Sequence, residues 1–279
     1  MLRFGEGSPV ILAAMPGHPP SEPAAGRRFG ARAVCAAAAL ALVAVPFGLL
    51  LLLVEERWRP LLHVDDGARD SLHRFAVAHG AFVDAMRTVG FLGSWVGYTV
   101  VFSLLALWLL RRRLPRLALF VVVTVLGSSL LNTIVKALVD RARPVLPDPV
   151  AHANGLSFPS GHAQSAMVAA CVLLLVFAPV LHGRARAAAF AAAVLWVLTV
   201  GFSRVALGVH YVSDVLAGFV LGAAWVALMT AAFGAWRRET GRPPADAARG
   251  LEPEAAPRLA DGGARPVRPP GAASGSRHP

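Results

Sequence analysis

The chain is poor in cysteine and in charge. Its 279 residues include two cysteines, Cys35 and Cys171, and both lie inside apolar runs. This count excludes a disulfide framework and a metal site built on CxxC motifs. Charged residues make up 15% of the chain and hydrophobic residues 56%, which is far from the composition of a soluble domain. The composition therefore indicates a polytopic membrane protein.

The formal net charge of +11 would suggest a nucleic-acid partner if the chain were soluble. Much of the arginine, however, stands in short segments beside apolar runs, as at Arg111, Arg112 and Arg113. Cytoplasmic loops of membrane proteins carry such an excess of basic residues. We therefore assign the charge to membrane topology and expect no nucleic-acid partner.

Six apolar runs are long enough to cross a hydrocarbon core of about 30 Å. They cover residues 34–54, 91–110, 117–138, 161–181, 187–205 and 212–236. Six spans place both termini on one side of the membrane, and the basic loops assign that side to the cytoplasm. The sequence thus predicts an all-α, multi-pass protein of the cell (plasma) membrane with six transmembrane helices.

Two terminal segments lie outside this six-span domain of residues 32–238. Residues 1–31 and 239–279 are rich in Pro, Gly, Ala and Arg and have no apolar period, so we expect two disordered cytoplasmic tails.

The loop between the first two spans has an apolar stripe within residues 66–90. The stripe consists of Leu72, Phe75, Phe82, Met86 and Val89 at near-helical spacing. It predicts one additional amphipathic helix. This helix lies at the membrane interface, covers another part of the molecule, or packs there without any part in the chemistry.

Polar residues stand at the ends of four predicted spans, and the topology places all of them on the outer side. Ionisable groups at membrane depth are costly and usually mark a functional site. One such group alone could simply extend its side chain to the interface. Six at the same depth and on the same side predict a shared site. The residues at these ends are Lys136, Arg143, Ser160, Gly161, His162, Arg204, His210 and Asp214.

The cationic members of this group suit a tetrahedral oxyanion such as phosphate. Lys136, Arg143 and Arg204 can donate charge-assisted hydrogen bonds. The N–H groups of Ser160 and Gly161, at the N-terminus of a helix, add further donors. Lys136 is the one lysine in a chain with 26 arginines, which indicates that a compact ammonium is required at this position.

The remaining members suit acid–base and nucleophilic chemistry. His210 and Asp214 are four residues apart, which on a helix places them on one face. A carboxylate there fixes the imidazole tautomer and makes His210 the expected nucleophile. His162 comes from another span and suits a general acid that protonates a leaving oxygen. No Asp/Glu cluster has the ligand spacing of a Mg²⁺ or Ca²⁺ site, so we expect no metal and no cofactor.

These residues fall into three motifs that together resemble the signature of the type 2 phosphatidic acid phosphatase superfamily, which also includes vanadium-dependent haloperoxidases. The motifs are Lys136-x6-Arg143-Pro144, Pro159-Ser160-Gly161-His162 and Ser203-Arg204-x5-His210-x3-Asp214. The resemblance implies a six-span helical core, an outward-facing site and a phosphohistidine intermediate. It implies His210 as nucleophile, Asp214 as its orienting partner, His162 as acid and then base, and a phosphate cradle of Lys136, Arg143, Ser160, Gly161 and Arg204.

The sequence therefore predicts an integral-membrane, metal-independent lipid phosphate phosphatase. A site level with the lipid headgroups favours a substrate from the outer leaflet, such as phosphatidic acid, phosphatidylglycerol phosphate or a polyprenyl diphosphate. Nothing in the sequence chooses among these lipids, and nothing in it bears on the oligomeric state.

Two alternatives to a phosphatase stay open. A lipid phosphotransferase would form the same intermediate but requires a site for an acceptor. A non-enzymatic six-span transporter or scaffold would explain the hydropathy and leave the spacing of the polar residues without a purpose.

Overall fold

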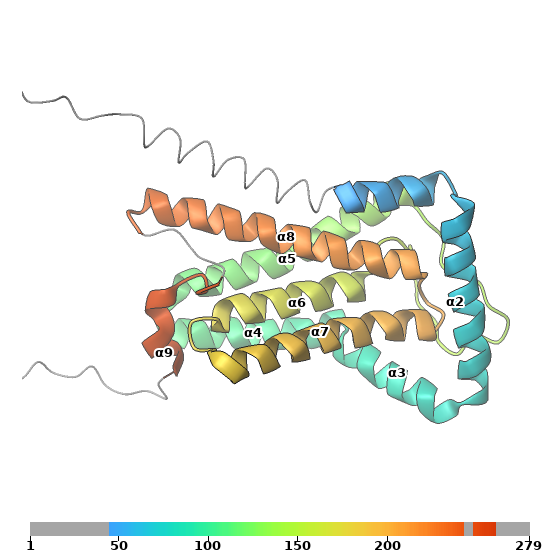
Figure 1. The fold of residues 1–279 in the computed structure, drawn as a ribbon, viewed down its shortest axis with the longest axis horizontal. Helices are drawn as coiled ribbons and strands as arrows, with labels where there is room; N and C mark the ends of the chain where they lie inside the picture. The colour runs from blue at the N-terminus through green and yellow to red at the C-terminus, as the bar shows by residue number, and fades with distance from the viewer. Residues whose placement is uncertain (1–44, 243–247, 261–279) are drawn as a thin grey trace, which may run out of the picture. The chain divides into compact units, whose positions relative to one another are not determined.

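A computed structural model describes residues 45–242 and 248–260, and every regular element among them is helical (Figure 1). The predicted tail 1–31 lies outside the described residues. In chain order the elements are the helical segment Val45–Glu55, α2 (Arg59–Ala78), α3 (Gly80–Leu92), α4 (Trp95–Arg111), α5 (Pro115–Val139), α6 (Gly161–Phe177), α7 (Gly183–Ala206), α8 (Val212–Glu239), the short 3-10 helix η1 (Pro253–Ala255) and α9 (Ala256–Ala260).

Three of these helices, α5, α7 and α8, are long and apolar enough to cross a membrane. The pair of α3 and α4 meets the same test jointly, although it bends by 42° at a break, and it raises the number to four. The helix α6 has 17 residues, about 26 Å at 1.5 Å per residue, and Val45–Glu55 is shorter. Residues 34–44 of the first predicted span lie outside the described part of the chain. The all-helical class is confirmed, and the count of six spans stays a prediction.

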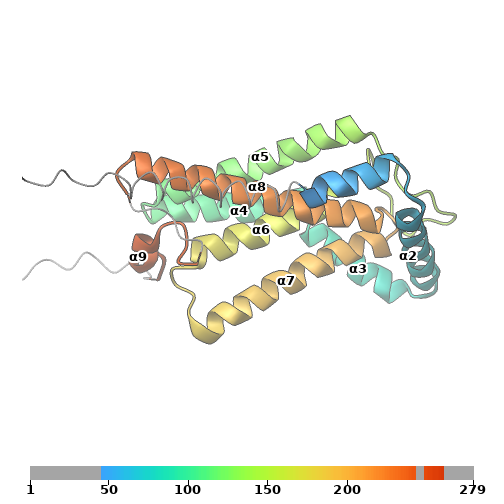
Figure 2. The ribbon, with the colours of Figure 1, turned by 45° about the horizontal axis from the view of Figure 1, so that its top comes forward.

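The helix α6 is central among the described helices. It packs against α4, α5, α7 and α8, and it runs between α7 and α8 in the views of Figures 1 and 2. Its buried face includes Ala163, Ala166 and Ala170. Gly218 of α8 faces it so closely that a β-carbon there would lie 2.6 Å from the carbonyl oxygen of Ser160. Small residues on both helices therefore allow the two backbones to approach each other.

The prediction of one amphipathic helix between the first two spans is wrong, because the segment forms two helices, α2 and α3. The chain leaves helical geometry at His79, with φ −132° and ψ 81°. The ring Nδ1 of His79 hydrogen-bonds to the carbonyl oxygen of Phe75 at 2.8 Å. The backbone N–H of His79 donates instead to the carbonyl oxygen of Ala76 at 3.1 Å. The side chain thus replaces the main-chain hydrogen bond that would continue α2.

The helix α2 lies across the ends of α7 and α8 (Figure 1) and packs on both. The part of the apolar stripe on α3 faces the same region, since Phe82 and Met86 pack against the buried residues Leu207 and Val209. Of the three possibilities that the sequence left open, the structure supports a cover over another part of the molecule.

The second predicted span, 91–110, corresponds to a helix that begins later. The helix α3 continues to Leu92, and α4 begins at Trp95. Ser94 between them is the N-cap of α4, because its Oγ accepts a hydrogen bond from the N–H of Gly97 at 3.2 Å. Serine is strongly preferred at this position, where its side chain satisfies a free N–H of the first helical turn.

A part of the C-terminal segment is packed rather than disordered. In residues 248–260, Leu251 is fully buried and Glu254 forms an ion pair with Arg237 of α8 at 2.9 Å. A buried leucine and an ion pair are tertiary contacts that the composition of the segment does not indicate. The prediction of disorder is therefore wrong for these residues, while 243–247 and 261–279 lie outside the described chain.

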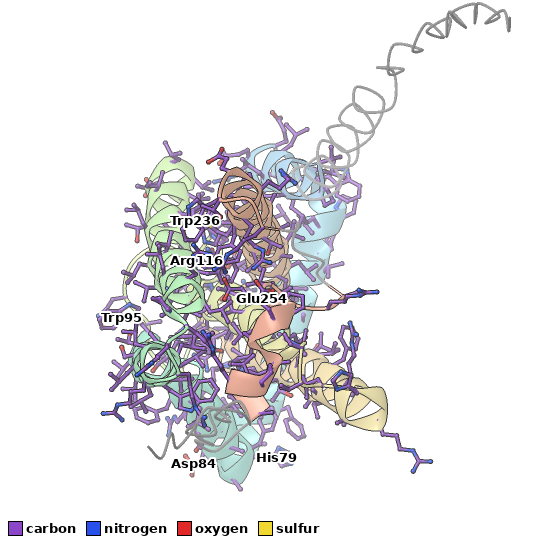
Figure 3. All side chains as sticks on the ribbon, turned by 90° about the vertical axis from the view of Figure 1, so that its left-hand side faces the viewer. His79, Asp84, Trp95, Arg116, Trp236 and Glu254 are labelled. Carbon is purple, nitrogen blue, oxygen red and sulfur yellow. The ribbon has the colours of Figure 1, made fainter. Side chains whose placement is uncertain are left out.

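The end of the bundle opposite α2 carries arginine beside tryptophan. Figure 3 looks onto this end, where Arg116 and Trp236 lie close together. The guanidinium of Arg116 is 5.2 Å from the centre of the Trp236 ring, and that of Arg112 is 5.2 Å from the centre of the Trp108 ring. Tryptophan is enriched at membrane–water interfaces, so this end of the bundle has a composition typical of one.

Candidate active site

All eight predicted site residues fall at the end of the bundle that α2 crosses. Arg143 lies in the loop between α5 and α6, and His210 lies in the turn between α7 and α8. The others occupy helix ends: Lys136 in the last turn of α5, Ser160, Gly161 and His162 at the start of α6, Arg204 in the last turn of α7, and Asp214 in the first turn of α8.

The buried His210 is held on both of its ring nitrogens. Its Nδ1 is 3.4 Å from Oδ2 of Asp214, and its Nε2 is 3.1 Å from Nη1 of Arg143. A carboxylate can only accept and a guanidinium can only donate, so the proton is assigned to Nδ1 and the lone pair to Nε2. Burial lowers the pKa of His210 to about 4, although Asp214 acts in the opposite direction. The imidazole is therefore neutral at pH 7.

A turn with left-handed backbone geometry at Gly208 sets the position of His210. Gly208 has φ +68°, a conformation that glycine adopts without a steric penalty, and the N–H of Val209 returns to the carbonyl of Arg204 at 3.1 Å. The backbone is therefore not helical at His210, and the prediction that His210 and Asp214 share one face of a helix is wrong in this respect. Their contact arises because the turn brings the imidazole over the first turn of α8.

The carboxylate of Asp214 is fully buried and held by several donors. Besides His210, it accepts hydrogen bonds from the N–H of Tyr211 at 2.9 Å, from Nη1 of Arg141 at 2.7 Å and from the hydroxyl of Ser157. Three donors beyond the imidazole fix the orientation of the carboxylate, and through it the tautomer of the ring.

Two cations hold the loop next to His210. Lys136 donates to the carbonyl of Leu156 and, at 3.5 Å, to that of Ser157, and Arg143 donates through Nε to the carbonyl of Gly155 at 2.9 Å. An ammonium group has three donors and a guanidinium group has five. Both residues therefore keep N–H donors beyond those that bind the loop.

The start of α6 offers one backbone donor fewer than the sequence predicts. The N–H of Ser160 donates to the carbonyl of Asp214 at 2.9 Å, and the Ser160 hydroxyl accepts from the N–H of Ala163 at 3.5 Å. In this arrangement the Ser160 N–H is not available to a phosphate. The N–H of Gly161 lies in the first helical turn, where the helix itself supplies no acceptor.

The residues His162 and Arg204 approach the backbone of α3. The ring of His162 contacts the carbonyl of Gly90, and a β-carbon on Gly90 would lie 1.8 Å from Nη2 of Arg204. Arg204 also donates to the hydroxyl of Ser203 at 3.0 Å and to the carbonyl of Met86 at 3.5 Å. A side chain at position 90 would displace the Arg204 guanidinium, so α3 takes part in shaping the site.

The residues around His210 and the pair of His162 and Arg204 are close enough to interact electrostatically. The positive charges of Arg204 and Arg143 both act on the ring of His162. Beside His162 is a cleft of about 260 Å³ whose lining combines polar and apolar groups. Its lining includes Ser128, Ser129, Asn132, Thr133, Gln164 and Ser165.

A family model described as the PAP2 superfamily matches residues 117–238, a stretch that contains all eight predicted site residues. Residues 117–238 are a PAP2 domain. It consists of α5, α6, α7 and α8 with the loops that carry the site. The family predicted from the three motifs is thereby confirmed.

Several curated proteins resemble the PAP2 domain. Phosphatidylglycerophosphatase B of Bacillus subtilis is 43% identical over 101 residues, which are 34% of this chain and 47% of the relative. Lipid A 1-phosphatase of Rhizobium johnstonii is 36% identical over 117 residues, 39% of this chain and 44% of the relative. Decaprenylphosphoryl-5-phosphoribose phosphatase of Mycobacterium tuberculosis is 35% identical over 108 residues, 38% of this chain and 55% of the relative. The chain thus spans about half the length of these curated relatives.

One solved structure resembles a larger part of the chain. It is the crystal structure of a transmembrane PAP2 type phosphatidylglycerolphosphate phosphatase from Bacillus subtilis, with a TM-score of 0.62 and 23% sequence identity. The match covers 69% of this chain and 94% of that one. At this identity the likeness shows a shared transmembrane fold.

Sequence reasoning missed three polar residues that the structure joins to the site of the PAP2 domain. Arg141 lies inside the first motif, between Lys136 and Arg143, and Ser157 lies two residues before the second, so closeness to the motifs was the available signal. Asp65 lies on α2, outside the PAP2 domain, and no pattern in the sequence indicates its contact with the site.

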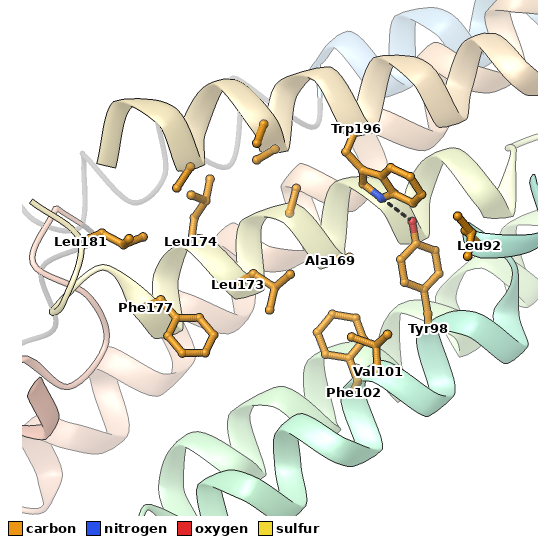
Figure 4. A pocket seen from close by; sticks show the side chains of 14 residues that line it. Leu92, Tyr98, Val101, Phe102, Ala169, Leu173, Leu174, Phe177, Leu181 and Trp196 are labelled. Atoms are coloured by element: carbon orange, nitrogen blue, oxygen red, sulfur yellow. Dashed lines mark hydrogen bonds between the residues drawn. The ribbon is translucent and has the colours of Figure 1, made fainter. Parts of the chain in front are cut away.

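The PAP2 domain also borders an apolar pocket of about 660 Å³ between α4, α6 and α7 (Figure 4). The indole N–H of Trp196 donates to the hydroxyl of Tyr98 at 3.1 Å, so both polar groups on this wall are satisfied. Leu92 lines the pocket at one end and Leu181 at the other. The pocket therefore extends from the α3–α4 break, close to the site, toward the opposite end of the helices.

Proposed function

We propose that the protein is an integral-membrane, metal-independent lipid phosphate phosphatase that acts through a phosphohistidine intermediate. The observation that carries the proposal is the setting of His210. Its Nε2 lone pair faces Arg143, and its Nδ1 faces the carboxylate of Asp214. A neutral imidazole oriented by a carboxylate, with a cation beside the attacking atom, is suited to nucleophilic attack on phosphorus.

In the first step, Nε2 of His210 forms a bond to phosphorus, and the bond from phosphorus to the leaving oxygen breaks. The electron pair stays on that oxygen, which takes a proton from His162. Lys136, Arg143 and Arg204 balance the charge on the three remaining phosphoryl oxygens. The N–H of Gly161 adds a neutral donor at the helix N-terminus.

In the second step, His162 acts as the base. Water gives it a proton while the water oxygen forms a bond to phosphorus, and the nitrogen–phosphorus bond breaks with its electron pair returning to Nε2. The products are inorganic phosphate and a protein in its starting protonation state. No metal or cofactor takes part in this scheme.

A lipid substrate is supported by the apolar pocket between α4, α6 and α7, which begins close to the site and can take a hydrocarbon chain (Figure 4). The relatives are named as phosphatases of a phosphatidylglycerophosphate, a lipid A and a decaprenylphosphoryl sugar phosphate. We propose a phosphomonoester or diphosphate of a membrane lipid as the substrate class.

The proposed site faces the outside of the cell, and residues 32–238 form the six-span phosphatase unit between two cytoplasmic tails. The arginines of the α4–α5 connection and those in the first turn of α7, which follows the α6–α7 connection, support this orientation. Both connections lie at the end of the bundle opposite the site, where the positive-inside rule places the cytoplasm (Figures 1 and 3).

The test is phosphate release by purified protein in detergent with excess EDTA, with phosphatidic acid and a polyprenyl diphosphate as parallel substrates. We expect release from at least one of them, and we expect His210→Ala to lower the rate roughly 1,000-fold or more. His182→Ala is the matched control, since His182 is exposed at the start of α7, at the other end of the bundle, and should keep the wild-type rate. Full activity in His210→Ala would rule out the proposed nucleophile.

A lipid phosphotransferase is the second candidate, and the cleft beside His162 favours it because its lining includes hydroxyl and amide side chains. A cleft lined by the hydroxyls of Ser129 and Thr133 and by the amide of Asn132 could hold an acceptor alcohol in place of water. The same assay distinguishes the two, because a transferase releases little inorganic phosphate until glycerol or another alcohol is added and then forms a new phosphate ester. No reaction in either assay would favour a non-enzymatic transporter or scaffold.

A further inference from the structure

Asp65 lies on α2, outside the PAP2 domain. Its side chain is fully buried, and it is bound to Arg141, which also binds Asp214. Nη2 of Arg141 is 2.9 Å from Oδ2 of Asp65, and Nη1 of the same guanidinium is 2.7 Å from Oδ1 of Asp214. One guanidinium is thus shared by two buried carboxylates.

The three charges leave an excess of one negative charge. Two carboxylates carry −2 and the guanidinium carries +1, so the group of Asp65, Arg141 and Asp214 has a net charge of −1. If Asp65 were neutral, the charge of Arg141 would cancel that of Asp214. In a buried setting such a cancellation matters, because charges interact there much more strongly than in water.

The reaction proposed above creates a positive charge next to this group. When Nε2 of His210 carries a phosphoryl group and Nδ1 keeps its proton, the imidazole ring is cationic. Asp214, 3.4 Å from Nδ1, is the carboxylate placed to stabilise that cation. A carboxylate already neutralised by Arg141 would stabilise it far less.

Asp65 also fixes the start of α8, the helix that carries Asp214. Oδ1 of Asp65 accepts a hydrogen bond from the N–H of Ser213 at 2.9 Å, and Oδ2 accepts one from the Ser213 hydroxyl. The side chain of Tyr211, the N-cap residue of α8, does not accept a hydrogen bond from the N–H of Ser213. Asp65 therefore acts as a cap for α8 that comes from another helix.

We infer that Asp65 is a positioning residue of the proposed reaction: its charge offsets that of Arg141, so that Asp214 remains an effective counter-charge for the phosphorylated His210. The inference rests on the proposed function. It gives α2 a part in the chemistry, in addition to its place across the ends of α7 and α8.

The test is the single-turnover rate of phosphoenzyme formation in Asp65→Asn, which keeps the size of the side chain and removes its charge. We expect the rate to fall roughly 10- to 100-fold, as is typical when the partner of a functional group is lost, while KM stays within about twofold of wild type. The matched control is Asp66→Asn. Asp66 is the neighbouring carboxylate on α2, half-exposed and paired with Arg69 at 2.8 Å, and its variant should keep the wild-type rate.

A charge role and a purely structural role are separated by the double variant Asp65→Asn/Arg141→Gln. Removing the guanidinium restores a net charge of −1, now carried by Asp214 alone, so we expect the double variant to form the phosphoenzyme faster than Asp65→Asn. If Asp65 only tethers α2 to α8, the second substitution removes a further contact and the rate falls again. That fall, or a wild-type rate in Asp65→Asn, would overturn the inference.

Loss of folding does not remove the test. If Asp65→Asn cannot be recovered as a folded protein, Asp65→Glu keeps the charge with a longer side chain. We then expect Asp65→Glu and the double variant to form phosphoenzyme, and their failure to do so would contradict the inference. A wild-type protein that turns over without any phosphoenzyme would instead overturn the proposed function, and this inference with it.

Discussion

At the scale of the residue, His210 owes its properties to its contacts. Its side chain is 3% exposed, and it lies between a carboxylate, which can only accept, and a guanidinium, which can only donate. Burial disfavours the charged imidazolium and lowers the pKa of His210 to about 4. In the free protein the residue is thus a neutral base at the pH of the cell, and it becomes cationic only when phosphorylated.

This pKa predicts where activity is lost on acidification. We expect kcat/KM for a phosphomonoester lipid to fall with a midpoint near pH 4, where His210 takes up a proton and loses its lone pair. The profile is best measured between about pH 3.5 and 5.5, because the substrate phosphate, with a second pKa of about 6, stays a monoanion there. Asp214→Asn removes a charge that raises the pKa of His210, so its midpoint should move to lower pH.

The same shift has a consequence for stability, and its sign follows from proton uptake. An unfolded chain binds a proton at His210 near pH 6.5, whereas the folded protein binds it only near pH 4. Over this window the unfolded state holds more protons at His210, so the contribution of His210 to the free energy of unfolding falls as the pH is lowered from about 6.5 to 4 and is constant above that range. An activity midpoint near pH 6.5 would contradict the burial of His210.

The identities of the site residues could be predicted from the sequence, because their spacing forms three motifs at helix ends. Their partners could not. Arg141 and Ser157 contact Asp214 because the loop between α5 and α6 folds back over α8, and no local pattern records that path. Asp65 is farther still, at a sequence separation of 76 residues from Arg141.

At the scale of the element, the crossing of α6 and α8 supports the site. Gly218 and Gly222 of α8 contact the backbone at the start of α6. A β-carbon on Gly218 would lie 2.6 Å from the Ser160 carbonyl oxygen, and one on Gly222 would lie 2.8 Å from the Gln164 carbonyl oxygen. The same crossing carries the hydrogen bond from the N–H of Ser160 to the carbonyl of Asp214. Contact between the helices and alignment of two of the motifs therefore depend on the same small residues.

A single methyl group at this crossing should be harmful. We expect Gly218→Ala to destabilise the protein by about 1–3 kcal/mol, because the helices must separate to accept it, and to lower phosphate release as the start of α6 shifts against α8. Gly67→Ala is the matched control. Gly67 lies within α2, where a β-carbon would meet no neighbouring atom within 4 Å, so alanine should raise stability by about 0.5–1 kcal/mol.

Thermal unfolding in detergent measures both changes. A midpoint for Gly218→Ala at or above that of the wild type would show that α6 and α8 are not packed as closely as described. The sequence predicts both helices from their apolar runs, and it does not predict the crossing. Nor does it predict the break at His79, which depends on a ring nitrogen that replaces a main-chain donor.

At the scale of the whole molecule, the chain combines a PAP2 domain with segments that lie outside it. Composition and hydropathy predict the membrane class and the helical fold, and the PAP2 match confirms the family for residues 117–238. Composition misjudges residues 248–260, which it predicts to be disordered, because the burial of Leu251 and the ion pair of Glu254 depend on partners elsewhere in the chain. The role of α2 likewise becomes visible only in three dimensions.

The central claim is that His210 carries the phosphoryl group during turnover. The most direct measurement is to mix the protein with a lipid substrate whose phosphate is radiolabelled, quench within one turnover, and locate the label by peptide mapping. We expect an acid-labile, alkali-stable label on His210, absent from His210→Ala and retained longer in His162→Ala, where the proposed base for hydrolysis is missing. Turnover of the wild-type protein with no label on His210, or a label that persists in His210→Ala, would contradict the claim.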